Sequence, residues 1–350
     1  MDDSYLRAQL AAHPSMRPQD AIKFFYQAHF GAEHLLTDPQ GARDDFVREW
    51  NGTPPTNEPL TEALSDRAAR VNLGAWKAAG LAPEWLFSLF YQSARTMSEK
   101  DEDAFFRDLD DMSELVKSGA FAFDADEWQK ALSSYRKAGA HAVHHSDFYR
   151  DYESPAYRVL SSRAARLVPV LQALPPLPQK DEPIVIALDG RAASGKSTAA
   201  AILSEALGAG VVAMDDFFLP PELRTPERLA QPGGNVDYDR FARDVLPHLC
   251  KTDAFAYRAF DCGEMKLGGE VAVPAGNLRI VEGSYSHHPR FGDYAALRVF
   301  FDLSPEEQAA RILKRNGEEM AQMFQTRWIP MEEAYFDAFS VREHADLIIR

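Results

Sequence analysis

The most informative part of the chain is PIVIALDGRAASGKSTAA, which runs from Pro183 to Ala200. Its first residues, Pro183–Gly190, form a short apolar run that ends in Asp-Gly, which is typical of a strand buried on both faces of a parallel sheet. Ser197–Gly208 predicts a helix that stops at a glycine. The sequence between them, Gly190–Ser197, matches G-x-x-x-x-G-K-[ST]. The stretch therefore predicts a strand, a phosphate-binding loop and a helix, in that order.

This loop, a P-loop or Walker A sequence, contains the residues needed to hold nucleotide phosphates. Its glycines let backbone N–H groups point inward, and the following helix N-terminus favours negative charge. We expect Lys196 to neutralise the β- and γ-phosphates and Ser197 to ligate Mg²⁺. The motif therefore predicts binding of ATP and Mg²⁺, with nucleotide contacts from Gly190, Ala193, Ser194, Gly195, Lys196, Ser197 and Thr198.

Further apolar runs in the second half have the length and composition of buried strands. They are GVVAMDD (Gly210–Asp216), LRIVEG (Leu278–Gly283), LRVFFDL (Leu297–Leu303) and ADLIIR (Ala345–Arg350). A helix is predicted at Pro305–Asn316, with proline in its first turn. Strands that alternate with helices predict an α/β fold with a mostly parallel sheet and flanking helices, here of the P-loop NTPase type.

The first half predicts a mainly α-helical domain. Helical patterns cover Ala21–Leu36, Pro83–Ala94, Asp101–Gly119 and the last part of Tyr135–Leu174, and no β alternation or repeat is evident before residue 180. A proline-rich, charged segment, Leu171–Pro183, predicts a stiff connector. We therefore expect a helical domain at 1–175, a linker at 176–183 and a P-loop domain at 184–350.

Composition restricts the partners. The 350 residues include 38 Lys plus Arg and 53 Asp plus Glu, for a net charge of -15. This charge argues against a general nucleic-acid or anionic-membrane binder, because both need a basic surface. No apolar stretch is long enough to span a membrane, the N-terminus lacks a signal-peptide pattern, and Cys250 and Cys262 form no metal motif. We expect a cytoplasmic protein, and the sequence leaves a homo-oligomer open.

Acids at strand ends and arginines near one helix suggest phosphoryl transfer. Asp215 lies at the C-terminal end of a predicted strand and could accept the proton of an attacking hydroxyl; helix capping or the Mg²⁺ shell are the alternatives. Glu282 suits the water shell of Mg²⁺, and simple solvation is its alternative. Arg311, Arg315 and Arg327 could balance charge on the transferred group, or could be ordinary exposed arginines.

The second half, Pro183–Arg350, resembles the uridine kinase family of P-loop kinases, in the wider group that includes pantothenate kinase and phosphoribulokinase. The matching segments appear in family order: GRAASGKST, MDDFFLP, GGNVDYDRF, FAYRAFDC, IVEGSY, VFFDLSPEEQAARILKRN and ADLIIR. The P-loop alone is widely shared, and the ordered set is more specific.

This resemblance implies roles for several residues. Asp215 matches the general base of the family, and Asp237 matches an acid that holds sugar hydroxyls. Tyr257 and Phe260 match residues that line the nucleoside pocket. Glu282 matches the acid of an EG turn, while Arg311 and Arg315 match the lid region. Arg327 is added to the substrate-binding candidates because it could belong to the same lid.

Two functions follow. The first is an ATP- and Mg²⁺-dependent kinase acting on a small-molecule hydroxyl, with uridine or another nucleoside as acceptor and pantothenate or a sugar as alternatives. The second is a nucleotide-dependent switch or NTPase whose helical domain binds a partner.

In the first half, His141, His144 and His145 could bind a metal, although capping and core roles fit an H-x-x-H-H spacing without cysteine better.

Overall fold

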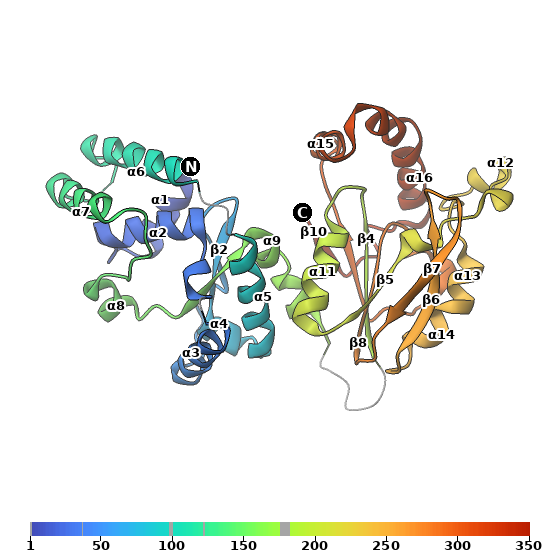
Figure 1. The fold of residues 1–350 in the computed structure, drawn as a ribbon, viewed down its shortest axis with the longest axis horizontal. Helices are drawn as coiled ribbons and strands as arrows, with labels where there is room; N and C mark the ends of the chain where they lie inside the picture. Colours follow the sequence, from blue (N-terminus) through green and yellow to red (C-terminus); the bar gives the residue numbers. More distant parts are fainter. Residues whose placement is uncertain (1, 37, 98–100, 122, 176–182) are drawn as a thin grey trace. The chain divides into compact units, whose positions relative to one another are not determined.

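The structure is a computed structural model that describes residues 2–36, 38–97, 101–121, 123–175 and 183–350 (Figure 1). The chain divides into two compact units, which we call unit 1 (Met1–Val168) and unit 2 (Pro169–Arg350). Most of the predicted linker, residues 176–182, lies outside the described residues. The two units are therefore described separately.

A five-stranded parallel sheet forms the centre of unit 2, in the order β10-β9-β4-β8-β5. The α/β fold class is confirmed, and each predicted strand is present. The central strand β4 pairs with β8 and β9 and is buried along its whole length. The P-loop begins where β4 ends, at the sheet edge where open α/β sheets bind ligands. The strands are β4 (Ile184–Gly190), β5 (Gly210–Ala213), β8 (Leu278–Glu282), β9 (Leu297–Phe301) and β10 (Leu347–Ile349).

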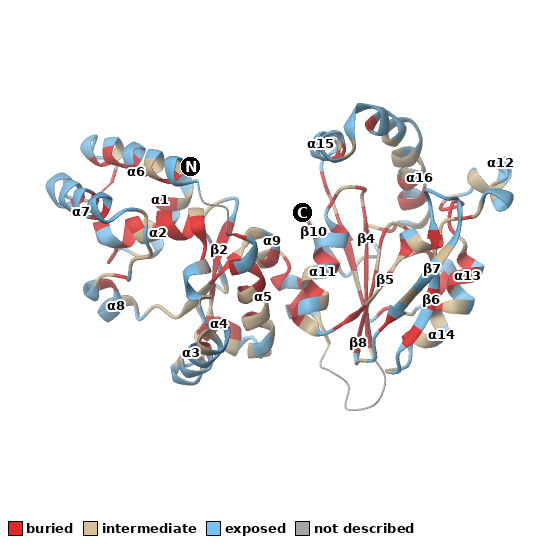
Figure 2. Cartoon of the chain, in the orientation of Figure 1, coloured by how far each residue is buried: buried red, intermediate tan, exposed pale blue. Residues whose placement is uncertain are grey.

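Helices cover both faces of this sheet (Figure 1). On one face α11 (Lys196–Leu207) packs against β4, β5 and β8. On the other face, strand residues such as Val281 join an apolar core with Phe241 of α13 (Tyr238–Asp244) and Tyr335 of α16 (Ile329–Phe339). Figure 2 shows the central strands as buried. This two-sided burial explains why the strands are nearly continuous apolar runs in the sequence.

The helix predicted at Pro305–Asn316 is longer than expected. It is α15 (Pro305–Met323), which kinks at Gly317 (φ 77°, ψ 176°) and continues into a π-helical turn, Phe324–Trp328. Unit 2 also contains an antiparallel hairpin of β6 and β7 that the sequence analysis does not predict. The other elements of unit 2 are 3-10 helices at Met214–Phe217, Pro221–Leu223 and Pro289–Phe291, α12 (Pro226–Leu229), α14 (Leu246–Leu249), β6 (Phe255–Asp261) and β7 (Lys266–Val273).

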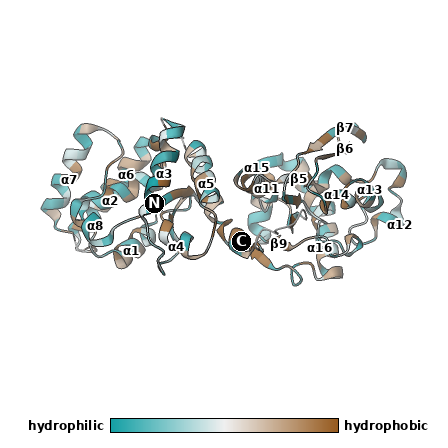
Figure 3. Cartoon of the chain, turned by 90° about the horizontal axis from the view of Figure 1, so that it is seen from below, coloured by the Kyte–Doolittle hydropathy of each residue, from teal (hydrophilic) through white to brown (hydrophobic). Residues whose placement is uncertain are grey.

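Unit 1 is mainly helical, as predicted. Side-chain caps begin several helices: Asp101 caps α6, and Asp124 caps α7, each by accepting from main-chain N–H groups. Figure 3 shows hydrophilic and hydrophobic residues mixed along these helices, as expected where one side faces a core. The elements are α1 (Asp3–Ala12), α2 (Pro18–Phe30), a 3-10 helix (Glu33–Leu35), α3 (Pro39–Gly52), α4 (Leu73–Ala78), α5 (Pro83–Thr96), α6 (Glu102–Lys117), α7 (Ala125–Ala138), α8 (Asp147–Glu153), α9 (Ser162–Ala165) and, across the boundary, α10 (Val168–Ala173).

The prediction that the first half has no strands was wrong. Unit 1 contains an antiparallel sheet of β1 (Thr61–Ala63), β2 (Ala68–Asn72) and β3 (Tyr157–Ser161). The middle strand β2 is buried from Ala68 to Val71, so it lacks the alternation that marks a half-exposed strand. The helix predicted in the last part of Tyr135–Leu174 is instead strand β3 followed by the short helices α9 and α10, because pairing with β2 overrides local helix propensity.

A buried polar network lies within unit 1. The Arg70 side chain is 2% exposed and donates to Gln27 Oε1 at 2.9 and 3.1 Å and to Gln9 Oε1 at 2.8 Å. Its guanidinium also lies over the Tyr157 ring, 4.5 Å from the centroid. Because a buried charge is costly unless its donors are bonded, these contacts fix how α1, α2, β2 and β3 meet.

The histidine cluster does not converge on one point. His145 is part of the buried network, with Nδ1 2.8 Å from Asp20 Oδ1 and Nε2 2.5 Å from the Tyr157 hydroxyl. His141 and His144 are exposed, and the ring of His141 contacts a main-chain carbonyl. In the part of the chain that the structure describes, no group of three or more His, Cys, Asp or Glu side chains is placed to hold a metal ion. Nor does any helix of that part have the length and apolarity to cross a membrane.

Candidate active site

The P-loop opens into a cavity of about 550 Å³ in unit 2. Its walls come from the P-loop and the start of α11, from the ends of β5 and β8, and from α15, the π-helical turn and α16. The cavity contains most of the predicted site residues: Ala193, Ser194, Gly195, Lys196, Ser197, Thr198, Asp215, Glu282, Arg311, Arg315 and Arg327.

The sharp turn at the start of the P-loop depends on Gly190. Its φ is 129°, which L-residues rarely adopt, and a Cβ there would lie 2.1 Å from the carbonyl oxygen of Phe301 on β9. Gly190 does not line the cavity; its carbonyl accepts from Lys196 Nζ at 2.6 Å. Its contribution is therefore to the path of the loop, because only glycine fits so close to β9 in this conformation.

The loop is suited to an anion. Helix α11 begins after Gly195, and no side chain caps its first N–H groups. The Ser194 hydroxyl, 1% exposed, has no hydrogen-bond partner among the described residues. The Lys196 ammonium is folded back onto the carbonyls of Gly190 and Arg191, at 2.6 and 2.9 Å. Uncapped helix amides, an unpartnered hydroxyl and an ammonium fit the phosphates of a nucleotide.

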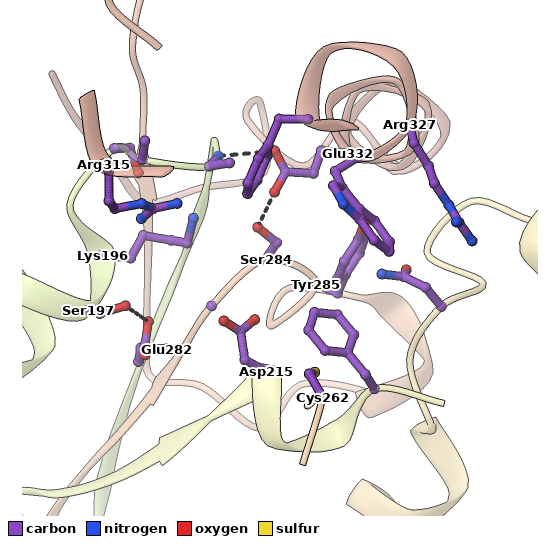
Figure 4. Close-up of a pocket in the computed structure, with 18 of the residues that line it drawn as sticks. Lys196, Ser197, Asp215, Cys262, Glu282, Ser284, Tyr285, Arg315, Arg327 and Glu332 are labelled. Carbon is purple, nitrogen blue, oxygen red and sulfur yellow. Dashed lines mark hydrogen bonds between the residues drawn. The ribbon is translucent and has the colours of Figure 1, made fainter. Parts of the chain in front are cut away.

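Two neighbouring aspartates follow β5 and have different environments. The Asp216 carboxylate accepts from the Tyr257 hydroxyl at 2.7 Å, outside the cavity. The Asp215 carboxylate lines the cavity and has no hydrogen-bond partner in the described part of the chain (Figure 4). Surrounding protein atoms raise the pKa of Asp215, the charge of Lys196 opposes that rise, and the charge of Asp216 adds to it. Asp215 is thus the carboxylate available to a ligand.

Ser197 and Glu282 form an oxygen-only pair beside the loop. The Ser197 hydroxyl donates to Glu282 Oε2 at 3.2 Å, as Figure 4 shows. Burial and the negative charge of Asp215 raise the pKa of Glu282, while Lys196 lowers it. A hydroxyl and carboxylates are ligands that Mg²⁺ prefers, and a nearby cation would relieve the repulsion between Glu282 and Asp215. These residues fit Mg²⁺.

The three predicted arginines reach the cavity from two segments. Arg311 and Arg315 lie one turn apart on α15, before the kink at Gly317. Arg327 lies in the π-helical turn, with its guanidinium 4.9 Å from the centroid of the Trp328 ring. All three are exposed to solvent in the cavity. They are therefore available to anionic groups of a ligand.

Three predicted substrate residues lie outside this cavity. Asp237 caps α13 by accepting from the N–H of Arg240 at 3.0 Å. The Tyr257 ring packs 5.1 Å from that of Phe217, and its hydroxyl donates to Asp216. Phe260 is 5% exposed. In the structure these side chains position the elements around the cavity.

The structure also brings in residues that the sequence analysis does not select. The buried carboxylate of Glu332 on α16 accepts from the Ala192 N–H at 3.0 Å and from the Ser284 hydroxyl at 2.6 Å, and burial raises its pKa. Glu332 thereby connects the P-loop to the end of β8. Arg224 and Asn235 also line the cavity. Asn235 lies two residues before Asp237 in a segment already noted, whereas Arg224 and Glu332 carry no recognisable pattern.

Several solved structures of kinases are similar to this chain. One is a possible uridine kinase from Bacillus stearothermophilus (17% identity, TM-score 0.41), which covers 54% of this chain and 97% of its own. Another is a proposed fructose transport system kinase from a Silicibacter species (24%, 0.44), covering 54% and 99%. A third is D-glycerate 3-kinase from Cryptococcus neoformans (16%, 0.34), covering 50% and 86%. No family model and no curated protein matches the chain.

Proposed function

We propose that this protein is an ATP- and Mg²⁺-dependent kinase that transfers a phosphoryl group to a hydroxyl of a small molecule. The observation that supports this most is the position of Asp215. It is a carboxylate without a hydrogen-bond partner among the described residues, in the same cavity as the P-loop and Arg315. An NTPase or switch needs the P-loop, but a base for an acceptor hydroxyl is specifically useful to a kinase.

In this proposal the P-loop holds the phosphates of ATP. The N–H groups at the start of α11 and the Ser194 hydroxyl bind phosphate oxygens, and Lys196 moves from the loop carbonyls to the phosphates. Ser197 and Glu282 would hold Mg²⁺, which when bound offsets the negative charge of the phosphates. Arg311 and Arg315 face the same region from α15.

The transfer itself needs one base and several cations. The acceptor hydroxyl gives its proton to the Asp215 carboxylate while its oxygen forms a bond to the γ-phosphorus. The bond between that phosphorus and the β–γ bridging oxygen breaks, and ADP leaves with the electron pair. Lys196, Arg311 and Arg315 stabilise the negative charge on the phosphoryl group during transfer.

A nucleoside such as uridine remains a prediction from the sequence. It depends on Asp237, Tyr257 and Phe260, and none of these lines the cavity. Pantothenate and sugars remain alternative acceptors.

The experiment that tests this function uses the full chain with labelled ATP, Mg²⁺ and a panel of nucleosides, pantothenate and sugars. We expect a phosphorylated small molecule from at least one acceptor, and little phosphate release without it. Asp239→Asn is the matched control for Asp215→Asn and should give the same product as the unmodified protein, because the Asp239 side chain is 87% exposed on α13 and lies outside the cavity. Phosphate release at one rate with every acceptor, and no product, would reject the kinase and favour an NTPase.

A further inference from the structure

Two arginines line the cavity without an assigned task. Arg224 follows the 3-10 helix Pro221–Leu223, and Arg327 lies in the π-helical turn more than a hundred residues later. Arg224 Nε donates to the carbonyl of Leu219 at 2.6 Å, which leaves its terminal nitrogens available. In the described part of the chain, neither guanidinium pairs with a carboxylate. In a protein of net charge -15, two arginines in one cavity without an acidic partner among the described residues suggest that the cavity binds an anion.

Arg327 lies away from the phosphate-binding loop, and Arg224 lies beside the end of β6. Figure 4 shows Asp215 between two groups of side chains: Lys196 and Ser197 on one side, Arg327 and Tyr285 on the other. The Arg224 guanidinium lies 5.6 Å from the centroid of the Phe260 ring, at the end of β6. Because Asp215 must face the reacting hydroxyl, the side beyond it is where the rest of the acceptor would lie.

Asn235 gives a second, independent indication. Its side chain is 6% exposed, lines the cavity and hydrogen-bonds to Tyr285. Its carbonyl oxygen Oδ1 is buried and has no partner among the described residues. A buried acceptor left unpaired is energetically costly, so such an atom is expected to receive a hydrogen bond from a ligand.

We propose that the phosphoryl acceptor is a small hydroxylated anion, a hydroxy acid or a sugar phosphate, bound by Arg224 and Arg327. Its carboxylate or phosphate is held by the two guanidiniums, whose planar N–H groups match such oxygens. A second hydroxyl donates to Asn235 Oδ1, and the reacting hydroxyl faces Asp215. A neutral nucleoside would leave both guanidiniums without a counter-ion.

This inference rests on the proposed kinase activity, and its test uses pairs of acceptors in which one member has an anionic group and the other has a neutral hydroxyl in its place. The full chain is given ATP, Mg²⁺ and three pairs: glycerate and glycerol, pantothenate and panthenol, ribulose 5-phosphate and ribulose. Uridine and cytidine are included. We expect product from an anionic member, with a KM at least tenfold below that of its neutral partner. The pair that gives a phosphorylated product shows whether the anionic group of the acceptor is a carboxylate or a phosphate.

Variants then test the two arginines. Arg224→Gln and Arg327→Gln should each raise the KM for the anionic acceptor about 10- to 100-fold and change the KM for ATP less than twofold. Arg224→Lys should recover part of the loss. Arg243→Gln is the control, because Arg243 is exposed and pairs with Asp244 outside the cavity. Unchanged acceptor KM in both variants, or a nucleoside as best acceptor, would overturn the inference while leaving the kinase intact.

A binding measurement separates this inference from the kinase activity. Glycerate, pantothenate, ribulose 5-phosphate and uridine are titrated calorimetrically into the chain with a non-hydrolysable ATP analogue. Binding of an anionic probe that is lost in Arg224→Gln and Arg327→Gln supports the anion site even if no transfer occurs, in which case the proposed function fails. Uridine binding alone, or no binding of any probe, rejects the anion site.

Discussion

Asp215 and Asp216 are adjacent in the chain, but their carboxylates have different surroundings. Asp216 is bonded to Tyr257, and its carbonyl accepts from Arg240, so it anchors the turn after β5. Asp215 is left facing the cavity with a raised pKa. A raised carboxyl pKa means that ionisation at neutral pH costs folding free energy, which is typical of a group kept for function.

Asp215→Asn is therefore expected to remove transfer without unfolding the protein. We expect the turnover rate to fall by about 10²–10⁴, because the general base is lost. Nucleotide affinity should stay within about threefold, and the melting temperature should not fall, because the variant removes a carboxylate that has no hydrogen-bond partner among the described residues and whose pKa is raised. Rate, calorimetric ATP binding and thermal melting check these effects. Transfer near the original rate would exclude Asp215 as the base.

The pH profile gives a second test of Asp215. Because its pKa is raised above the ordinary aspartate value of 3.8, the base becomes protonated at a higher pH than a free aspartate would. We expect kcat/KM to fall on the acid side at a pH clearly above 3.8, and this limb should be absent from the residual activity of Asp215→Asn. A flat profile down to pH 4 would contradict this.

Among the elements, the segment from α15 to α16 carries much of the cavity wall. Arg311 and Arg315 lie before the kink at Gly317, and Arg327 lies after it. Gly317 has positive φ, and nothing lies within 4 Å of where its Cβ would be, so conformation and not space requires glycine there. The π-helical turn then changes the direction of the side chains that follow, as such turns often do at functional sites.

Gly317→Ala is expected to straighten α15 and displace the π-helical turn. Alanine in this conformation costs about 1–3 kcal/mol, so a regular helix becomes favourable. We expect kcat/KM for the acceptor to fall at least tenfold with little loss of melting temperature, because Arg327 and Trp328 move. Steady-state kinetics and circular dichroism measure this.

Gly269→Ala is the matched control for the kink. Gly269 lies in β7, has no positive φ and has open space around its Cβ position. Its kinetics should match those of the unmodified protein. If both glycine variants lose activity equally, or Gly317→Ala is fully active, the kink does not position the cavity wall.

At the scale of the whole molecule, the P-loop cavity belongs to one unit. Every residue that lines the P-loop cavity lies between Ala192 and Glu332, within unit 2. A chain of residues 169–350 is therefore expected to bind ATP with an affinity within about threefold of the full chain, because it retains every described residue that lines the cavity. Calorimetry checks this. A loss of binding in a folded fragment would mean that unit 1 contributes to the nucleotide site.

Unit 1 should lose stability in mild acid. Burial lowers the pKa of His145 to about 4 from 6.5, against a hydrogen bond to Asp20 that raises it. As the pH falls through about 6.5, the His145 imidazole therefore takes up a proton in the unfolded chain but not in the folded unit. We expect the free energy of unfolding to fall by about 1–2 kcal/mol between pH 7 and pH 5.

Tryptophan fluorescence can follow unit 1 selectively. In a Trp328→Phe background the remaining tryptophans all lie in unit 1, at Trp50, Trp76, Trp85 and Trp128. Urea denaturation midpoints at pH 7 and pH 5 show how strongly the stability of unit 1 depends on pH, which we call the pH slope. His145→Gln should lower stability at pH 7 but reduce the pH slope, whereas the exposed His144→Gln should leave the slope unchanged. Equal slopes in all three proteins would exclude His145 as the cause.

Much of unit 2 could be predicted because its signals are local. A run buried on both faces, followed by glycines, a lysine and a helix, places β4, the P-loop and α11 from neighbouring residues alone. The same holds for Asp215, since it lies two residues after the end of β5, and the carboxyl end of that strand must lie at the ligand edge. Strands β2 and β3 were missed because β2 is buried without alternation and β3 is a strand only through its pairing with β2.

The sequence by itself determined the P-loop side of the cavity, because that loop is a short contiguous motif between a buried strand and a helix. Only the tertiary structure decided which other side chains line the cavity. It brought Arg224, Asn235 and Arg327 into one cavity and left Asp237, Tyr257 and Phe260 outside it. Such a wall is assembled from segments far apart in the chain, so its members depend on how the elements pack and not on their neighbours in sequence.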